Sequence, residues 1–423
     1  MRFVGYTVAL TSLGVALQVQ FQSVSGGAAA SLAPAAVGLA SFTAEYAFAS
    51  RDSTTPGPRA ESRDSTPPVP PPPPPSLDFS GVLYANFQYG GEAGPAKASN
   101  KFDVERAYLT FRIPAGDDFS VRVTTDLFQQ TSPGSDSFYR GWVVRAKYAY
   151  LQYNYLRVSG WRAFARAGLL QTVFIEHDEQ FWPRWISTSP TERAGYFSSA
   201  DAGVSTSLSL PGKVGEVYAT LTNGPGYTSR EVDRFKDYAA RVTLTPWGRR
   251  QSDFLRTLAL SAWGYKGATA SRFADGGAGQ LGPVGDALRR DRWGVHAGVA
   301  DPRFTFAAQY AARTEETDTG SNTSAAPRAV GDSTGVLVSA YAIVRPFLIA
   351  SRGSKIPLAL LGRVDRVTAN RRSGSRYNTV IAGLIWDLSK RASLSLDYQE
   401  TVPVDGAPLL PAKRYFAHIV ARY

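Results

Sequence analysis

The last nine residues of the chain, Tyr415-Phe-Ala-His-Ile-Val-Ala-Arg-Tyr423, carry the pattern that decides the fold class. Successive side chains of a β-strand point to opposite faces. One face of this stretch therefore holds Tyr415, Ala417, Ile419, Ala421 and Tyr423. The other face holds Arg414, His418 and Arg422. One apolar face opposite a basic one predicts a strand in a wall that separates two surroundings.

The same alternation recurs from Leu77 onward, and it defines sixteen candidate strands. They are expected near residues 78–90, 101–113, 118–130, 145–156, 161–171, 201–210, 215–223, 236–246, 254–265, 292–300, 303–313, 333–344, 357–367, 377–387, 392–401 and 414–423. Most approach the roughly 9 to 11 residues that a tilted strand needs to cross a bilayer.

The connections between these strands alternate in length. Short turns include residues 114–117, 157–160, 211–214, 301–302 and 389–391, whereas long connections include 131–144, 172–200, 224–235, 266–291 and 314–332. One connection that alternates with the long ones, 345–356, is longer than the other short turns. The alternation predicts an all-β fold, a 16-stranded antiparallel transmembrane β-barrel with short periplasmic turns and long external loops. Because the strand count is even, the first strand is expected to begin, and the last strand to end, at the short-turn side.

Composition supports this fold class. Aromatic residues make up 12% of the 423 residues, yet the mean hydropathy is −0.19, as expected for strands that alternate between lipid and water. Beyond the N-terminal region no apolar run reaches the roughly 18 to 20 residues of a membrane helix. Cysteine is absent, which excludes a disulfide framework, a thiolate metal site and a cysteine nucleophile.

The N-terminal part divides into two segments. Residues 1–49 are expected to form an export region, because Arg2 precedes an apolar stretch and a second apolar stretch ends in Ala47-Phe-Ala49. Cleavage after Ala30 or after Ala49 fits the pattern, and Ala49 is favoured. Residues 50–76 are rich in proline and predict a semi-rigid periplasmic linker, either a passive tether or a partner-binding segment. Residues 77–423 then form the barrel.

Arginines recur on the strand faces that oppose the apolar ones. An arginine on the lipid face costs about 2–4 kcal/mol at the bilayer midplane, so these side chains are expected to face an aqueous lumen. A cationic wall selects anions; alternatively, the arginines pair with carboxylates such as Asp126 and Asp365 and hold the barrel's shape. The predicted pore-lining and anion-binding set is Arg106, Arg112, Arg122, Arg162, Arg166, Arg241 and Arg363.

The net charge of the chain also bears on whether the barrel favours anions. The chain carries a formal charge of +11, and residues 1–76 hold four basic and four acidic residues, so the whole excess lies in the barrel. General surface charge is the plain interpretation, and a field that favours anions is the functional one.

The connection 172–200 mixes charged and aromatic residues. Such a loop suits a segment that folds inward and narrows a pore, although an ordinary surface loop fits as well. The residues predicted to form the constriction are Glu176, His177, Asp178, Glu179, Arg184 and Arg193.

Residues 77–423 resemble the phosphate-selective porin O/P family. Three stretches carry the resemblance: Glu105 to Phe111; Ala149 to Tyr153 with Phe164 to Gln171; and Ala200 to Ser205 with Tyr218 to Tyr227. The resemblance implies an outer-membrane channel that forms a homotrimer and passes small anionic or hydrophilic solutes, phosphate among them. The external loops are poor in lysine, which departs from the family's pattern at the mouth.

The resemblance also implies partners. The apolar terminal strand resembles the signal read by the barrel-assembly machinery, with Tyr415, Ile419 and Tyr423 as its residues. Outer-membrane lipid and lipopolysaccharide are the expected surroundings. No cofactor, metal or nucleic acid is expected.

Two other functions can be compared with the same residues. Catalysis would need a base, and the three histidines His177, His296 and His418 lack recognisable partner motifs, so an enzyme is not expected. A non-conducting barrel that tethers the envelope or serves adhesion is the alternative, and conductance would distinguish it from a channel.

Overall fold

The computed structural model describes residues 77–92, 98–129, 141–231, 233–249, 254–270, 287–319, 329–371, 373–404 and 411–423. The predicted export region and the proline-rich linker lie outside the described residues. Within the described ranges, none of the helices has both the length and the apolar character needed to cross a membrane.

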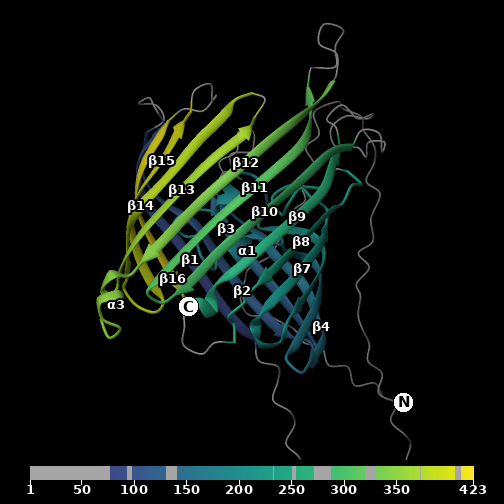
Figure 1. Ribbon diagram of the computed structural model, residues 1–423, viewed down its shortest axis with the longest axis horizontal. Helices are drawn as coiled ribbons and strands as arrows, with labels where there is room; N and C mark the ends of the chain where they lie inside the picture. The colour runs from purple at the N-terminus through teal and green to yellow at the C-terminus, as the bar shows by residue number, and fades with distance from the viewer. Residues whose placement is uncertain are drawn as a thin grey trace, which may run out of the picture. The chain divides into compact units, whose positions relative to one another are not determined.

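Sixteen antiparallel strands form one closed barrel (Figure 1). In chain order they are β1 Asp78–Glu92, β2 Ala98–Pro114, β3 Phe119–Gln129, β4 Trp142–Val158, β5 Trp161–Gln171, β6 Ala200–Ser209, β7 Gly215–Thr222, β8 Asp237–Leu244, β9 Ala259–Ala270, β10 Ala287–Asp301, β11 Phe304–Thr319, β12 Ala329–Val344, β13 Leu358–Asn370, β14 Ser375–Asp387, β15 Ala392–Pro403 and β16 Ala412–Arg422. Each strand pairs with its neighbours in sequence, and β1 pairs with β16. The predicted fold class is confirmed.

The predicted strand boundaries differ most from the observed ones at β9 to β12. Residues 254–265 were expected to be a strand, but Phe254–Thr257 form a 3₁₀ turn, η4, and β9 starts at Ala259. Strand β11 continues to Thr319, where its residues are polar on both faces. Alternation gives no signal there, because neither face is apolar.

Most connections at the end of the barrel near the C-terminus are short (Figure 1). The β4–β5 turn has two residues with positive φ, Ser159 at 50° and Gly160 at 84°, which suits the right-handed twist of a tight hairpin. The longer β12–β13 connection, Arg345 to Pro357, contains α3, Pro346–Ala350. We call this end the short-turn end and the opposite end the long-loop end.

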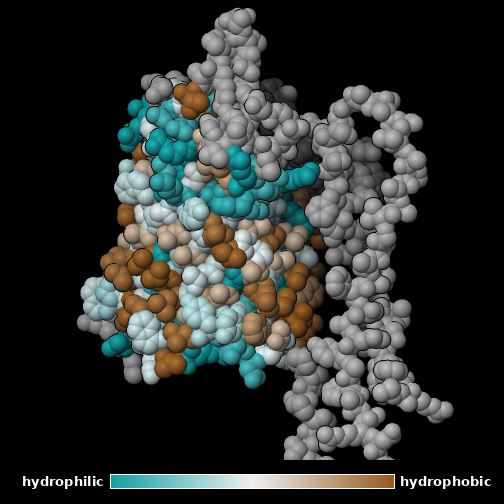
Figure 2. Space-filling view, turned by 90° about the vertical axis from the view of Figure 1, so that its right-hand side faces the viewer, coloured by the Kyte–Doolittle hydropathy of each residue, from teal (hydrophilic) through white to brown (hydrophobic). Residues whose placement is uncertain are grey.

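An apolar belt surrounds the barrel, and Figure 2 shows part of it as a hydrophobic band below a polar upper region. Exposed aliphatic side chains on the outward face include Leu83, Leu109, Val144, Val242, Leu360, Leu396 and Ile419. Exposed aromatic side chains lie towards both edges: Phe79, Phe119, Trp386 and Tyr423 near the short turns, and Tyr238, Trp293 and Tyr415 farther along the strands. Such girdles are typical of membrane barrels.

The seam between β1 and β16 ends at Tyr423. Its backbone exchanges two hydrogen bonds of 3.1 Å with Gly81, and its ring lies against Phe79 with centroids 5.6 Å apart. A Cβ at Gly81 would lie 2.0 Å from the Tyr423 ring, so a larger residue at this position would displace that ring.

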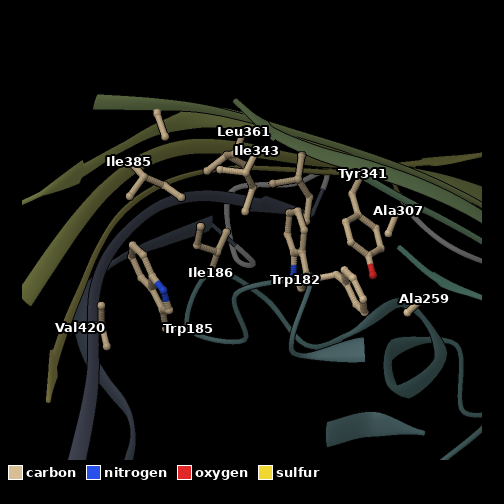
Figure 3. Packing of buried hydrophobic residues seen from close by; sticks show 13 residues of the cluster. Trp182, Trp185, Ile186, Ala259, Ala307, Tyr341, Ile343, Leu361, Ile385 and Val420 are labelled. Atoms are coloured by element: carbon tan, nitrogen blue, oxygen red, sulfur yellow. The ribbon is translucent and has the colours of Figure 1, made fainter. Parts of the chain in front are cut away.

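The connection between β5 and β6 lies inside the barrel; we call residues 172–199 the inner loop. It contains α1, Ile175–Asp178, and α2, Pro190–Arg193. Trp182, Trp185 and Ile186 of the loop pack against inward side chains of the wall, as Figure 3 shows. The wall residues of this cluster are Ala259, Ala307, Tyr341, Ile343, Ala359, Leu361, Ile381, Ile385 and Val420. The core of the molecule therefore lies between the inner loop and one side of the barrel.

Candidate functional site

Arg363 on β13 attaches the middle of the inner loop to the wall. Its side chain has no exposed area and forms an ion pair of 2.6 Å with Asp365. The guanidinium also donates to Ser187 Oγ at 3.0 Å and to the Thr188 carbonyl at 2.7 Å, and it lies 4.9 Å from the centre of the Trp182 ring. The arginine points into the barrel as its strand parity predicts, but it is bonded to the loop.

Arg241 on β8 attaches the start of the loop in the same manner. Its Nε donates to the Val173 carbonyl at 2.8 Å, and its terminal nitrogen pairs with Glu216 at 2.5 Å. A second terminal nitrogen lies 3.1 Å from His177 Nδ1, and His177 Nε2 lies 2.9 Å from Ser261 Oγ. Burial and the nearby Arg241 charge hold the pKa of His177 well below its usual value, so its imidazole is neutral at neutral pH.

Asp178 is the most deeply buried charged group of the loop. Tyr341 donates to its carboxylate, Gln309 Nε2 lies 3.2 Å from it, and His296 Nε2 lies 3.8 Å from it. Burial raises the pKa of Asp178 to about 6, although both hydrogen bonds act against the rise. The third histidine, His418, is separate and lies 2.8 Å from Asp397.

Strands β8 to β16 all contribute inward side chains that contact the loop, and we call this surface the docking wall. Besides the residues above, Tyr196 of the loop donates to the Ala311 carbonyl at 3.3 Å, and Arg193 donates to Thr401 at 3.3 Å. Gln399 donates to the Ile186 carbonyl at 3.0 Å.

The inward face of β2 to β5 is different, and five cations lie on it: Arg106, Arg122, Arg145, Lys147 and Arg166. We call it the cationic wall. Arg106 and Arg145 both bond Asp126 Oδ2, at 3.1 and 3.0 Å. Arg166 donates to Gln152 and Gln171, both at 2.9 Å, and stacks over Phe164 and Tyr150.

Arg122 connects the cationic wall to the edge of the loop, with a contact of 3.4 Å to Glu176. The side chains of Arg106, Arg145 and Glu176 are 28%, 22% and 42% exposed although all three point into the barrel. Water therefore reaches this side of the interior. Arg184, Glu179 and Glu192 form a further ionic cluster on the loop, in which Arg184 pairs with both carboxylates at 2.5 Å.

The remaining predicted residues lie at the short-turn end. Arg112 is exposed and lies 3.3 Å from Asp78. Arg162 is exposed, and within the described part of the chain its side chain makes no hydrogen bond or ion pair. The structure thus places the seven predicted arginines in three settings: the docking wall, the cationic wall and the short-turn end.

Sequence reasoning missed Arg145 and Lys147. The strand pairing shifts by one residue between Thr124 and Thr125, so that Lys147 and the following Tyr148 both point inward. The bulge brings Lys147 Nζ to 4.1 Å from the centre of the Tyr108 ring. The Arg145–Lys147 alternation was the available signal, but the bulge interrupts it one residue later.

No protein-family model matches the chain. No curated protein matches its sequence. Solved structures do match its fold. OmpF of Salmonella typhi in complex with daunomycin is 12% identical, with a TM-score of 0.55 over 82% of this chain and 97% of that one. An anion-selective porin from Comamonas acidovorans is 11% identical, with a TM-score of 0.53 over 82% of this chain and 100% of that one.

Outer-membrane expressed OmpT of Vibrio cholerae is 10% identical, with a TM-score of 0.51 over 82% of this chain and 98% of that one. At this identity the similarity establishes the barrel fold, and function has to be argued from the chain's own residues.

Proposed function

We propose that this protein is an outer-membrane porin, a passive diffusion channel for small hydrophilic solutes with a preference for anions. The carrying observation is the division of the barrel interior. The inner loop packs against the docking wall, and the water-accessible space lies beside the cationic wall. The apolar belt, the aromatic girdles and the fold shared with outer-membrane proteins support a membrane location.

The cationic wall would favour anions for a simple electrostatic reason. Four arginines lie on β2 to β5 beside the buried Lys147. On the opposite side the loop edge presents Glu176, and also Glu179 and Glu192, which pair with Arg184. A solute that passes between them meets oppositely charged sides, and beside a protein wall charge interactions are stronger than in bulk water. Because the wall has more cations than carboxylates, we expect anions to reside there longer than cations.

The remaining expectations belong to the same proposal. Phosphate is the candidate solute that the family resemblance implies. Homotrimer formation is likewise proposed, as is the role of Tyr415, Ile419 and Tyr423 in assembly; these three side chains are exposed on the outer face of β16. Residues 1–49 would direct export, and residues 50–76 would link the barrel to the periplasm.

The test is to reconstitute the purified barrel and to measure single-channel conductance, together with the entry of an uncharged sugar into liposomes. Stable conductance steps and sugar entry are the expected results. A correctly folded barrel that passes neither ions nor sugar would contradict the proposal and favour the tethering alternative. Current block by added phosphate would support phosphate as a solute.

A further inference from the structure

A cavity of about 1070 Å³ lies at the short-turn end, beneath the inner loop. The β6–β7 and β8–β9 turns line its sides, and residues Gly160 and Arg162 of β5 and its turn contribute a third side. The loop residues His177, Gln180 and Phe181 form its inner boundary. None of the five cations named on the cationic wall lines it, so its charge comes from other residues.

The cavity has an excess of positive charge. Arg162, Lys213, Arg241 and Arg256 line it, and Glu216 is the one carboxylate among its lining residues in the described part of the chain. Glu216 is already paired with Arg241 at 2.5 Å. The side chains of Arg162 and Lys213 are exposed and have no hydrogen bond or ion pair to any described residue. Two cations are therefore available to a ligand.

The backbone at Lys213 gives independent support. Lys213 has φ 58° and follows Gly212 at φ 71°, so both residues of this turn are left-handed. Glycine and asparagine adopt this conformation at lower cost than lysine does. The chain thus keeps a lysine where another residue would fit the backbone better, and strain of this kind is typical of positions with a functional role.

The boundary beneath the loop is partly apolar. Phe181, Leu210, Ala259 and Ala300 line the cavity alongside the cations. Phe181 is 5% exposed and belongs to the cluster that attaches the loop, so its position is fixed. An inorganic anion would contact only the basic rim, whereas an anion with an apolar body would contact both surfaces.

From these observations we infer that the cavity binds an organic anion with a carboxylate group and an apolar body, such as an aryl carboxylate. The carboxylate would bond Arg162 and Lys213, and the apolar body would lie against Phe181 and Leu210. This inference deepens the proposed function and rests on it, because it names the class of solute that the channel would hold at its short-turn end.

The experiment uses benzoate as the probe. Binding to the purified barrel in detergent is measured by calorimetric titration, and current block is measured with benzoate added to either side of a planar bilayer. Acetate, which lacks the apolar body, and benzamide, which lacks the charge, are the matched ligands. We expect saturable benzoate binding, weaker binding of both matched ligands, and block at lower concentration from the short-turn side.

Variants assign the effect to the cavity. Lys213→Asn and Arg162→Gln should each weaken benzoate binding by about fivefold, which corresponds to about 1 kcal/mol. Asparagine tolerates the left-handed conformation, so Lys213→Asn should unfold at the same or a higher urea concentration than the unchanged protein. The control is Lys390→Asn in a second, smaller cavity at the same end, lined by Arg345, Asp387 and Arg422, which should leave benzoate binding unchanged.

The outcomes separate this inference from the proposed function. Equal binding of benzoate and benzamide would overturn the site, and so would unchanged affinity in both variants, even if the channel conducts. Saturable benzoate binding that both variants weaken, in a barrel that conducts no ions, would support the site and contradict the porin proposal.

Discussion

The docking wall and the cationic wall are built from the same alternation, yet they contain different chemistry. On the docking wall Arg363 and Arg241 are nearly without exposed area, and both bond the backbone of the inner loop. On the cationic wall Arg106 and Arg145 keep about a quarter of their side-chain area exposed. Strand parity places all four arginines inside the barrel, but only their partners decide which of them a solute could meet.

The comparison shows that an inward arginine is not by itself a pore-lining residue. A buried guanidinium that is fully bonded contributes to the architecture, because removing it leaves its carboxylate without a partner in a dry environment. A stacked and partly hydrated guanidinium retains donors for a passing anion. The two walls should therefore respond differently to the same kind of substitution.

The largest effect is expected at Arg363. Replacing Arg363 with Met leaves Asp365 buried with Ser339 as its remaining partner, and should lower the free energy of unfolding by about 3–5 kcal/mol. Urea titration of the refolded barrel in detergent measures this. The double variant Arg363→Met, Asp365→Leu should recover part of the loss, because no unpaired charge remains. If the single variant Arg363→Met were as stable as the unchanged protein, the structural role given to Arg363 in the docking wall would be wrong.

Asp178 tests the same wall through pH. Its folded pKa of about 6 lies above the usual value of 3.8, so its contribution to stability is full below the usual value and is lost as pH rises through 6. A rise of two pKa units amounts to at most about 3 kcal/mol. Between pH 4 and pH 7 the unchanged protein should therefore lose stability relative to Asp178→Asn, measured at the same pH values.

The control for this profile is His177, whose pKa shift has the opposite direction. Because burial lowers its pKa, its contribution is present above the usual histidine pKa and is lost as pH falls through the lowered value. The decline at acid pH should therefore remain in Asp178→Asn. Identical pH profiles in both proteins would contradict the assignment of the neutral-pH loss to Asp178.

Apolar packing of the loop gives a smaller effect. Ile186 is 2% exposed, and Ile186→Ala should cost about 2 kcal/mol or more through lost burial and the cavity it leaves. Loosening the loop should also increase fluctuations in single-channel current. The matched control is Ile356→Ala in the β12–β13 connection, 48% exposed, which should change stability by less than about 0.5 kcal/mol. Equal losses in both variants would contradict the packing argument.

On the cationic wall the stability effect should be smallest and the effect on selectivity largest. Arg166→Glu removes two hydrogen bonds to glutamine side chains, about 1 kcal/mol, but reverses a charge beside the proposed passage. Its reversal potential should move towards cation preference with conductance retained. Arg241→Glu places a like charge beside Glu216 and should destabilise the loop. If both variants change only the reversal potential, the distinction between the walls is wrong.

The barrel fold could be predicted from the sequence, because the alternation of side chains and the lengths of turns are local properties. Strand faces at Arg241, Arg363 and Tyr415 to Tyr423 followed from parity alone. The end of β11 did not, since residues 314–319 are polar on both faces. Lys147 was missed because a bulge changes parity within β4, and the division into two walls depends on long-range contacts such as Asp178 with Tyr341.

The central claim is that the water-accessible side of the barrel interior is cationic and selects anions. The most direct test is the reversal potential of the unchanged protein in a planar bilayer under a potassium chloride gradient. We expect a potential of the sign set by chloride. A potential at zero, or one of the sign set by potassium, would contradict it.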